Sequence, residues 1–510
     1  MNNVLLISPS TNSYYTLTAH LGLSYIATKL EDYFEIYGLD LNVYQQVYGM
    51  NLEALLDLVG AVLDNYSIKY VGISVLEETL GQAYEIAKLC REKEVCCFAG
   101  GIYPTLFAES MPKEFKYCIR GDGEYIIQKF LLSLENGGNI YQIEGLSIYS
   151  EEESKWIHVG EPGAITCKDD FFPARNVFDQ LNGHFRYTSA RMITSRGCVY
   201  HCTFCTNKMF QNKYISRSIH NIVEEIRMLA SQGIKEIILS DDQFLGTCIE
   251  EYQHALDVIK AIKNILVENN IRLNFQVRAD QWLRCTKCLP EMIEVLCEIS
   301  SAFIDDNPEL SMRINGRVMH GVGIDIGVES FLDRKLSSFR KGYMAEKNIK
   351  CIRNLISLPI DIGIYAILFT PDITMEEVVL EIITYYDEYL SKHYESKVLL
   401  ANLFKTLVPY QGTEIYDVLL KRNRLIPPRG YRFEDLRVAA FYVIFVNEIE
   451  RMIYREDISF SQFFDCILNF AEYCRMLKIE GDMKKELSGL IVNQEGNEKE
   501  IYWKIREYIL

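Results

Sequence analysis

Three cysteines within eight residues constrain this 510-residue chain more than any other feature. Cys198, Cys202 and Cys205 follow the pattern C-x3-C-x2-C, just after a short apolar run at Met192-Ile193. Thiolates at this spacing bind a soft metal ion or an iron–sulfur cluster. A ferredoxin-type run needs a fourth cysteine nearby, which the sequence lacks, so a four-iron cluster held by these three would keep one iron open. The alternative is a zinc site that His201 or a distant residue completes.

The stretch around these cysteines, Arg191–Lys208, resembles the signature of the radical SAM enzymes. The resemblance implies that the three cysteines hold a [4Fe-4S] cluster and that the methionine part of S-adenosylmethionine (SAM) binds the open iron. An electron then cleaves SAM into methionine and a 5′-deoxyadenosyl radical. The family also has an aromatic residue just before the third cysteine. Phe204 occupies that position, and the resemblance therefore assigns it to the SAM site.

Composition and charge exclude several classes of protein. The net charge of −17 argues against a surface that binds the phosphates of DNA or RNA. The longest apolar run, Val438–Val446, is far too short to cross a bilayer. The first residues are typical of a buried strand rather than of a leader, and the fifteen cysteines have no regular spacing, which is typical of reduced thiols. We therefore expect a cytoplasmic protein with neither a membrane nor a nucleic acid as its partner.

Residues 1–140 alternate apolar runs with helical patterns. Continuous apolar runs are typical of parallel strands that are buried on both faces, so this region predicts an α/β fold with a Rossmann-like, doubly wound sheet. Five strands are expected, at Val4–Ser8, Phe34–Leu39, Tyr70–Ser74, Val95–Ala99 and Tyr117–Arg120. Ligands of such sheets bind beyond the carboxyl ends of the strands.

Four segments of this region resemble the cobalamin-binding domain that precedes many radical SAM barrels: Leu21–Glu31, Val71–Ser74, Gly100–Thr105 and Arg120–Glu124. The resemblance implies cobalamin near Ser74, Gly100, Gly101, Pro104, Thr105, Gly121 and Glu124. The D-x-H-x-x-G motif, whose histidine binds cobalt in several such enzymes, is absent. His20 is the only histidine in the first 150 residues, and we do not expect it to bind cobalt. Because some relatives with this domain have lost the cofactor, cobalamin binding and its loss both stay open.

From Met192 onward, strand and helix patterns alternate with the spacing of a β/α barrel. The expected strands are Met192–Ser195, Glu236–Ser240, Leu273–Val277, Gly321–Gly327, Ile362–Leu368 and Val398–Thr406. Six strands match the partial (β/α)6 barrel of the radical SAM family. We place this barrel at residues 189–415, after a linker at 141–188 that contains a small hairpin. Residues 416–510 have helical patterns and would form a C-terminal domain that covers the barrel mouth or binds a partner.

Polar residues stand where the expected barrel strands end, which is where barrels of this kind carry their active sites. The resemblance assigns the methionine ammonium of SAM to Asp241 or Asp242, since a carboxylate is the natural partner of an ammonium group. Gln276 and Arg278 follow on the third strand, and an arginine fork suits the methionine carboxylate. Glu329 ends the fourth strand, where relatives contact the ribose. No catalytic residue beyond these cofactor contacts can be identified.

Together these features predict a radical SAM enzyme, most simply a cobalamin-dependent methyltransferase that acts on an unactivated carbon. Its substrate would be a peptide or a small molecule such as a secondary metabolite, and flavodoxin or ferredoxin would supply the electron. One alternative keeps the barrel with a vestigial cobalamin domain, as a dehydratase, epimerase or cyclase. Another is a metal-binding scaffold without catalysis, which would hold zinc and leave SAM intact.

Overall fold

The computed structural model describes residues 1–442, except 12–15, 164–168, 170, 210–212, 305–318, 390–404, 428 and 440. The chain folds as two compact units. The first comprises residues 1–197 and 213–241, and the second comprises residues 198–212 and 242–510. The unit boundaries therefore fall on both sides of the cysteine loop.

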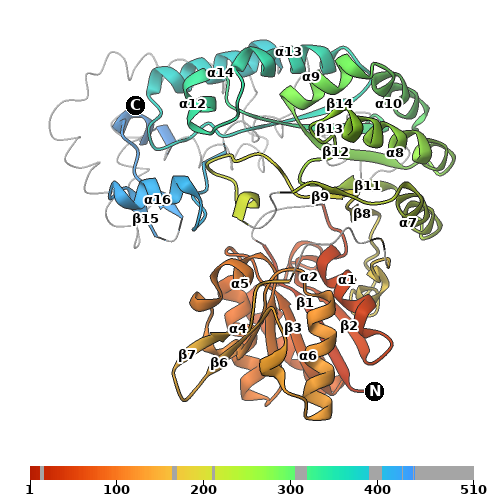
Figure 1. Ribbon diagram of the computed structural model, residues 1–510, viewed down its shortest axis with the longest axis vertical. Coiled ribbons are helices and arrows are strands. Elements are labelled where there is room, and N and C mark those ends of the chain that lie inside the picture. The colour runs from red at the N-terminus through yellow and green to blue at the C-terminus, as the bar shows by residue number, and fades with distance from the viewer. Residues whose placement is uncertain are drawn as a thin grey trace. The chain divides into compact units, whose positions relative to one another are not determined.

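A seven-stranded sheet forms the centre of the first unit, with the strand order β2-β1-β3-β4-β5-β6-β7 (Figure 1). The strands are β1 (Asn3–Ser8), β2 (Glu35–Asp40), β3 (Ile68–Ser74), β4 (Cys96–Gly100), β5 (Tyr117–Ile119), β6 (Leu146–Ser150) and β7 (Lys155–His158). The first five pair in parallel, as predicted, whereas β6 and β7 are antiparallel. The β6–β7 hairpin comes from the segment that the sequence predicts as a linker, and it extends the sheet.

Helices cover both faces of this sheet. They are α1 (Leu21–Leu30), α2 (Leu41–Gln46), α3 (Leu52–Asn65), α4 (Leu80–Glu92), α5 (Ile102–Phe107) and α6 (Glu124–Asn136). Successive side chains of a strand point to opposite faces. Leu5 and Ile7 of β1 therefore pack into the core under α3 and α4, while Val4 and Leu6 pack into the core under α1 and α6. The continuous apolar run of β1 thus fills two cores at once.

The rest of the first unit is a βαβ segment interrupted by the cysteine loop. Strands β8 (Ser189–Met192) and β11 (Glu236–Leu239) pair in parallel, and α7 (Ile219–Ser231) lies between them in the chain. Ser218 begins α7 by accepting a hydrogen bond from the amide of Asn221, as an N-cap serine does. The short strands β9 (Ser195–Arg196) and β10 (Ile215–Ser216) pair antiparallel on either side of the loop.

The second unit contains three parallel strands, β12 (Arg272–Arg278), β13 (Val322–Glu329) and β14 (Asp361–Ala366). Among the described residues its helices are α8 (Ile249–Glu268), α9 (Ala279–Cys288), α10 (Glu291–Ala302), α12 (Asp333–Ser338), α13 (Ala345–Ile356), α14 (Met375–Glu388) and α16 (Glu414–Lys421) (Figure 1). Helix α8 packs on α10, and α9 packs on α13. Four of the expected barrel strands are thus found as β11, β12, β13 and β14. The first one, expected at Met192–Ser195, lies three residues earlier as β8 and shares only Met192 with the prediction.

The sixth expected strand, at 398–406, lies mostly outside the described residues. Its described end, Thr406, forms a parallel bridge with Phe369. The predicted C-terminal helical domain is described only as far as residue 442. That part contains α16 and a short hairpin of β15 (Leu425–Ile426) and β16 (Gly430–Tyr431). The remainder of this prediction lies outside the described residues.

Candidate active site

The base of the cysteine loop is closed by backbone contacts within the first unit. Arg196 pairs with Ile215, and Ser195 pairs with Ser216. Gly197 follows with a φ of +86°, and a Cβ atom built there would lie 2.0 Å from the carbonyl oxygen of Lys213. Only glycine permits such an approach, so the residue before Cys198 is constrained by the closing of the loop.

Asp241, at the end of β11, holds the first strand of this base. Its Oδ1 accepts hydrogen bonds from the amide and the hydroxyl of Thr194, both at 2.9 Å, and from the amide and the hydroxyl of Ser195. Its Oδ2 is buried and, in the described part of the chain, has no hydrogen-bond partner. Burial raises the pKa of this carboxyl group from 3.8 to about 6, although the four hydrogen bonds act in the opposite direction. Asp241 is therefore positioned to order the entry to the cysteine loop.

This raised pKa predicts a pH dependence of stability. Between about pH 4 and pH 6 the folded protein holds a proton on Asp241 that the unfolded chain has released, so the free energy of unfolding falls as the pH rises. The expected loss is about 3 kcal/mol, at 1.36 kcal/mol per pKa unit. Asp241→Asn keeps an acceptor oxygen and removes the titration. Chemical denaturation from pH 4 to pH 7 should show the loss in the wild type and not in this variant.

The neighbouring substitution Asp242→Asn serves as the control and should keep the wild-type pH profile, because Asp242 is exposed. An Asp241→Asn profile identical to that of the wild type would contradict the raised pKa.

A second buried network, which the sequence analysis missed, lies under the same strands. The guanidinium of Arg217 is fully buried and donates to the carbonyl oxygen of Ile193 and to Glu225, both at 2.7 Å. Arg175 donates to the other oxygen of Glu225 and to the carbonyl oxygen of Arg191, both at 2.6 Å. The three charged groups thus fix the backbone of β8 and the residue after it, immediately before the cysteine loop.

The cysteines themselves belong to the second unit. Cys202 is buried, whereas Cys198 and Cys205 are partly exposed. Burial raises the pKa of Cys198, and it raises the pKa of Cys205 to about 11. A metal that binds these thiols must therefore displace protons. Thr203 anchors the loop, since its amide donates to the carbonyl oxygen of Phe339 and its hydroxyl to that of Ser338.

The donor set fits a [4Fe-4S] cluster by its chemistry, because three soft thiolates in one loop are the usual ligands of such clusters. Within the residues that the structure describes, no three His, Cys, Asp or Glu side chains lie together as metal ligands. Ligation by Cys198, Cys202 and Cys205 therefore stays a prediction based on residue type and spacing. Phe204, the aromatic residue of the motif, packs edge-on against Phe339 with ring centroids 5.0 Å apart.

Arg278, predicted for the SAM carboxylate, lies beside Cys202. One guanidinium nitrogen is 3.6 Å from the Cys202 sulfur, and Nε donates to Asp280 at 3.0 Å. The guanidinium also stacks on Tyr200, with its carbon 3.7 Å from the ring centroid. A further nitrogen donates to the carbonyl oxygen of Lys341 at 2.5 Å. The structure thus places a fixed positive charge next to one predicted cluster ligand.

The other residues predicted to bind SAM are Asp242, Gln276 and Glu329, and they differ in their exposure and hydrogen-bond partners. Asp242 accepts a hydrogen bond from the side-chain amide of Asn207 at 2.7 Å, and its charge raises the pKa of Cys198 and Cys205 slightly, behind the larger effect of burial. Of the two aspartates, Asp242 is thus the one next to the cysteine loop. Gln276 is exposed on β12. Glu329 ends β13, and its Oε1 accepts from the ammonium of Lys341 at 3.1 Å.

Two cavities in the first unit lie at the carboxyl ends of its parallel strands. The larger has a volume of about 380 Å³ and the smaller about 150 Å³. Ser74 and His20 line both of them. Of the residues predicted to bind cobalamin, Gly100, Gly101 and Gly121 line the smaller cavity. A Cβ atom at Gly100 would meet nothing closer than Ile119 at 3.9 Å, whereas one at Gly101 or Gly121 would meet the backbone of Val75 or Gly163.

Three of the predicted cobalamin residues do not line these two cavities. Thr105 instead connects the loops around the smaller one, since its hydroxyl donates to the carbonyl oxygen of Gly101 at 2.7 Å and accepts from the amide of Gly121 at 2.9 Å. Pro104 and Glu124 are buried in the helices α5 and α6 that follow the loops.

His20, which borders both cavities, caps α1. Its Nδ1 accepts a hydrogen bond from the amide of Leu23 at 3.2 Å, so the ring carries its proton on Nε2. Burial lowers the pKa of His20 to about 4, and the ring is therefore neutral at physiological pH. The sequence showed His20 only as a residue before a helix. Its place at the cavities, like that of Arg191 and Asn42 in the larger one, follows from contacts between distant segments.

The comparison with family models identifies one domain of the chain. Residues 192–381 match the model of the radical SAM superfamily, so the chain contains a radical SAM domain. This match confirms the prediction of a radical SAM enzyme, and such a domain implies SAM and a [4Fe-4S] cluster as cofactors. No helix of the described residues has the length and apolar character needed to span a membrane.

One individual relative is similar over most of the chain, and a second is similar over about half of it. The uncharacterized methyltransferase PH0819 of Pyrococcus horikoshii is 22% identical over 476 residues, which cover 90% of this chain and 92% of that protein. The 4′-phospho-dehydrooxetanocin synthase of Priestia megaterium is 23% identical over 53% of this chain and 35% of its own.

Two solved structures share the fold. The cobalamin-dependent SAM radical enzyme OxsB, with aqua-cobalamin bound, matches 96% of this chain and 75% of its own at a TM-score of 0.66 and 17% identity. The radical SAM methyltransferase TsrM from Kitasatospora setae, with cobalamin and a [4Fe-4S] cluster bound, matches 84% of this chain and 76% of its own at a TM-score of 0.60 and 19% identity. The predicted α/β fold class, with its resemblance to cobalamin-dependent radical SAM enzymes, is confirmed.

Proposed function

We propose that this protein is a cobalamin-dependent radical SAM methyltransferase that acts on an unactivated carbon of a peptide or small molecule. The observation that carries the proposal is the pair of cavities at the carboxyl ends of the N-terminal sheet, with glycines at Gly100, Gly101 and Gly121. Ligands of doubly wound sheets bind at this edge. The methyltransferase name of the Pyrococcus horikoshii relative and the cobalamin in both solved neighbours support the same conclusion.

Each cofactor has a proposed place in the chain. Cys198, Cys202 and Cys205 would hold the cluster, while Asp242 and Glu329 would contact the ammonium and ribose of SAM. When bound, SAM supplies the radical that takes a hydrogen atom from the substrate, and cobalamin supplies the methyl group. The chain's own task is to hold these groups and to exclude competing reactions. An electron donor such as flavodoxin or ferredoxin and a location in the cytoplasm complete the proposal.

The residues around the cysteines are suited to this task. Arg278 places a permanent positive charge beside Cys202, which offsets part of the negative charge of three thiolates. Asp280 and Tyr200 fix the direction of that guanidinium. In the first unit, the hydrogen bond from the amide of Leu23 occupies Nδ1 of His20, so the other ring nitrogen of His20 is an N–H donor rather than a cobalt ligand.

The experiment that tests the function uses the full chain, purified and reconstituted without oxygen with iron, sulfide and hydroxocobalamin. We expect a corrinoid absorption spectrum that survives gel filtration, formation of 5′-deoxyadenosine from SAM under reducing conditions, and transfer of a deuterated methyl group from labelled SAM to candidate peptides or metabolites. 5′-Deoxyadenosine without retained corrinoid would instead support the cobalamin-free dehydratase, epimerase or cyclase. Zinc in place of iron, with intact SAM, would identify a metal-binding scaffold.

A further inference from the structure

The backbone at the end of β13 adopts an unusual turn. Glu329 has a φ of +61°, in the left-handed region that residues with a side chain rarely occupy. The amide of Ser330 donates to the carbonyl oxygen of Val328 at 2.7 Å, which closes a three-residue turn around Glu329. The register of β13 against β14 also shifts between Gly327 and Glu329. Such a conformation is costly and persists only where its surroundings enforce it.

Hydrogen bonds hold the backbone on both sides of Glu329. The side-chain amide of the fully buried Asn348 donates to the carbonyl oxygens of Val328 and Ser330, at 2.9 and 2.8 Å. The carbonyl oxygen of Glu329 accepts from the amide of Ile367, after β14, at 2.7 Å. These contacts fix the carbonyl groups of three consecutive residues.

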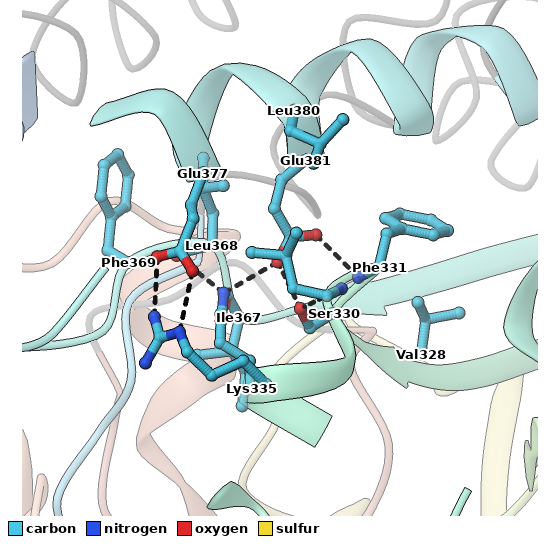
Figure 2. A network of polar contacts seen from close by, with 12 residues as sticks. Val328, Ser330, Phe331, Lys335, Ile367, Leu368, Phe369, Glu377, Leu380 and Glu381 are labelled. Atoms are coloured by element: carbon cyan, nitrogen blue, oxygen red, sulfur yellow. Dashed lines mark hydrogen bonds and ion pairs between the residues drawn. The ribbon is translucent and has the colours of Figure 1, made fainter. Parts of the chain in front are cut away.

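A buried ion pair between Lys335 and Glu381 holds the residues that directly follow Glu329 in the chain (Figure 2). Glu381 of α14 accepts hydrogen bonds from the hydroxyl of Ser330 and, at 2.8 Å, from the amide of Phe331. Lys335 of α12 donates to Glu381 at 3.0 Å and to the carbonyl oxygens of Ile367 and Leu368, at 2.7 and 3.0 Å. All three ammonium protons are thus used. Both charged side chains are only 1% exposed.

Stability alone does not account for this pair. Burying two opposite charges costs desolvation energy that their attraction often fails to recover, and well-packed apolar residues can replace such pairs without loss of stability. What apolar residues cannot do is bond to the backbone at the ends of two strands. The pair joins the segment after β13 to the segment after β14, and it does so next to Glu329, whose backbone φ is positive.

We propose that Lys335 and Glu381 are positioning residues that hold the turn at Glu329, so that the carboxylate of Glu329 is presented to the hydroxyl groups of SAM. Lys341 assists, since its ammonium donates both to Glu329 and to the carbonyl oxygen of Gly327 at 3.1 Å. The choice of SAM as the ligand rests on the proposed function, whereas the control of the turn by the ion pair does not.

The test uses the full chain and three variants. Lys335→Met combined with Glu381→Leu replaces the pair by apolar residues of similar size. Ser330→Ala removes the hydroxyl that donates to Glu381 and accepts from the amide of Leu332 at 3.0 Å, and it is the variant to use if the double variant does not fold. Arg353→Met is the matched control, because the exposed side chain of Arg353 forms an ion pair with Glu388, which lies on the same helix α14 as Glu381.

Hydrogen exchange within residues 327–333 is measured in the protein without cofactors and read at the amide of Ser330. This amide closes the turn by donating to the carbonyl oxygen of Val328, and it keeps that acceptor in every variant. We expect exchange about tenfold faster in the double variant and clearly faster in Ser330→Ala, with wild-type exchange in Arg353→Met. In the reconstituted enzyme, we expect equal iron content and about tenfold weaker SAM binding in the double variant.

Unchanged exchange at 327–333 in both the double variant and Ser330→Ala would overturn the proposal. Faster exchange with unchanged SAM affinity would overturn the assignment of Glu329 to SAM and would leave the methyltransferase proposal untouched. Because the exchange measurement needs neither cluster nor cobalamin, a failure of the proposed function cannot be mistaken for a failure of the positioning.

Discussion

Replacing Cys202 with alanine is expected to abolish iron binding by the cysteine loop and, with it, all cleavage of SAM. Cys202 is the most deeply buried of the three predicted ligands, and Arg278 lies beside its sulfur. A cluster held by only three thiolates has none to spare, because loss of one leaves a second iron without a protein ligand. Iron and sulfide analysis after reconstitution without oxygen, together with chromatography for 5′-deoxyadenosine, would measure both losses.

The matched control for this substitution is Cys288→Ala. Cys288 is exposed on α9, in the same unit of the chain, and the mechanism assigns it no role. Its iron content and SAM cleavage should equal those of the wild type. A Cys202→Ala protein that kept a full complement of iron and its activity would refute the assignment of the cysteine loop, while a loss of iron in Cys288→Ala would point to a second cluster.

The sequence predicted the strands of the first sheet well for a clear physical reason. A strand such as β1 packs against helices on both faces, so nearly every residue must be apolar, and the run Val4–Ile7 is visible without any knowledge of its partners. The cysteine motif was equally visible, because the chemistry of a cluster fixes the type and the spacing of its ligands within one short segment. Features of this kind can be predicted because they depend only on the residues of one short segment.

The two aspartates after β11 show what a local sequence pattern cannot predict, namely the direction in which each side chain points. Asp241 and Asp242 are adjacent and chemically equal in the sequence, and both could have faced SAM. In the structure Asp241 turns to the amides of Thr194 and Ser195, whereas Asp242 turns to Asn207. Successive side chains near a strand end point in opposite directions, and only the fold decides which direction leads to the core.

Contacts between distant segments were invisible for the same reason. Lys335 and Glu381 are separated by 46 residues, and each stands among other charged residues that face solvent. A helical pattern with many charges normally predicts a solvated face. The cavities of the first unit likewise depend on loops that follow different strands, so the sequence alone could not show that Gly100, Gly101 and Gly121 line one cavity.

Filling the smaller cavity of the first unit should separate cobalamin binding from SAM cleavage. Gly100 ends β4 and lines this cavity, and a Cβ atom built there would meet nothing closer than Ile119 at 3.9 Å. A phenylalanine at this position can therefore extend into a space of only about 150 Å³. We expect Gly100→Phe to exclude the corrinoid and to abolish methyl transfer. Cleavage of SAM to 5′-deoxyadenosine should continue, because the cysteines are unchanged.

Gly100 is a sharper choice than its neighbour Gly101. Gly101 has a φ of +102°, and a Cβ atom there would lie 3.1 Å from the carbonyl oxygen of Val75, so any substitution strains the turn itself. Loss of corrinoid from a Gly101 variant could thus report a damaged fold. The control for Gly100→Phe is Gly81→Phe, since Gly81 is exposed on α4 with nothing within 4 Å of its Cβ position. Corrinoid retained equally by Gly100→Phe and Gly81→Phe would show that the cofactor does not use this cavity.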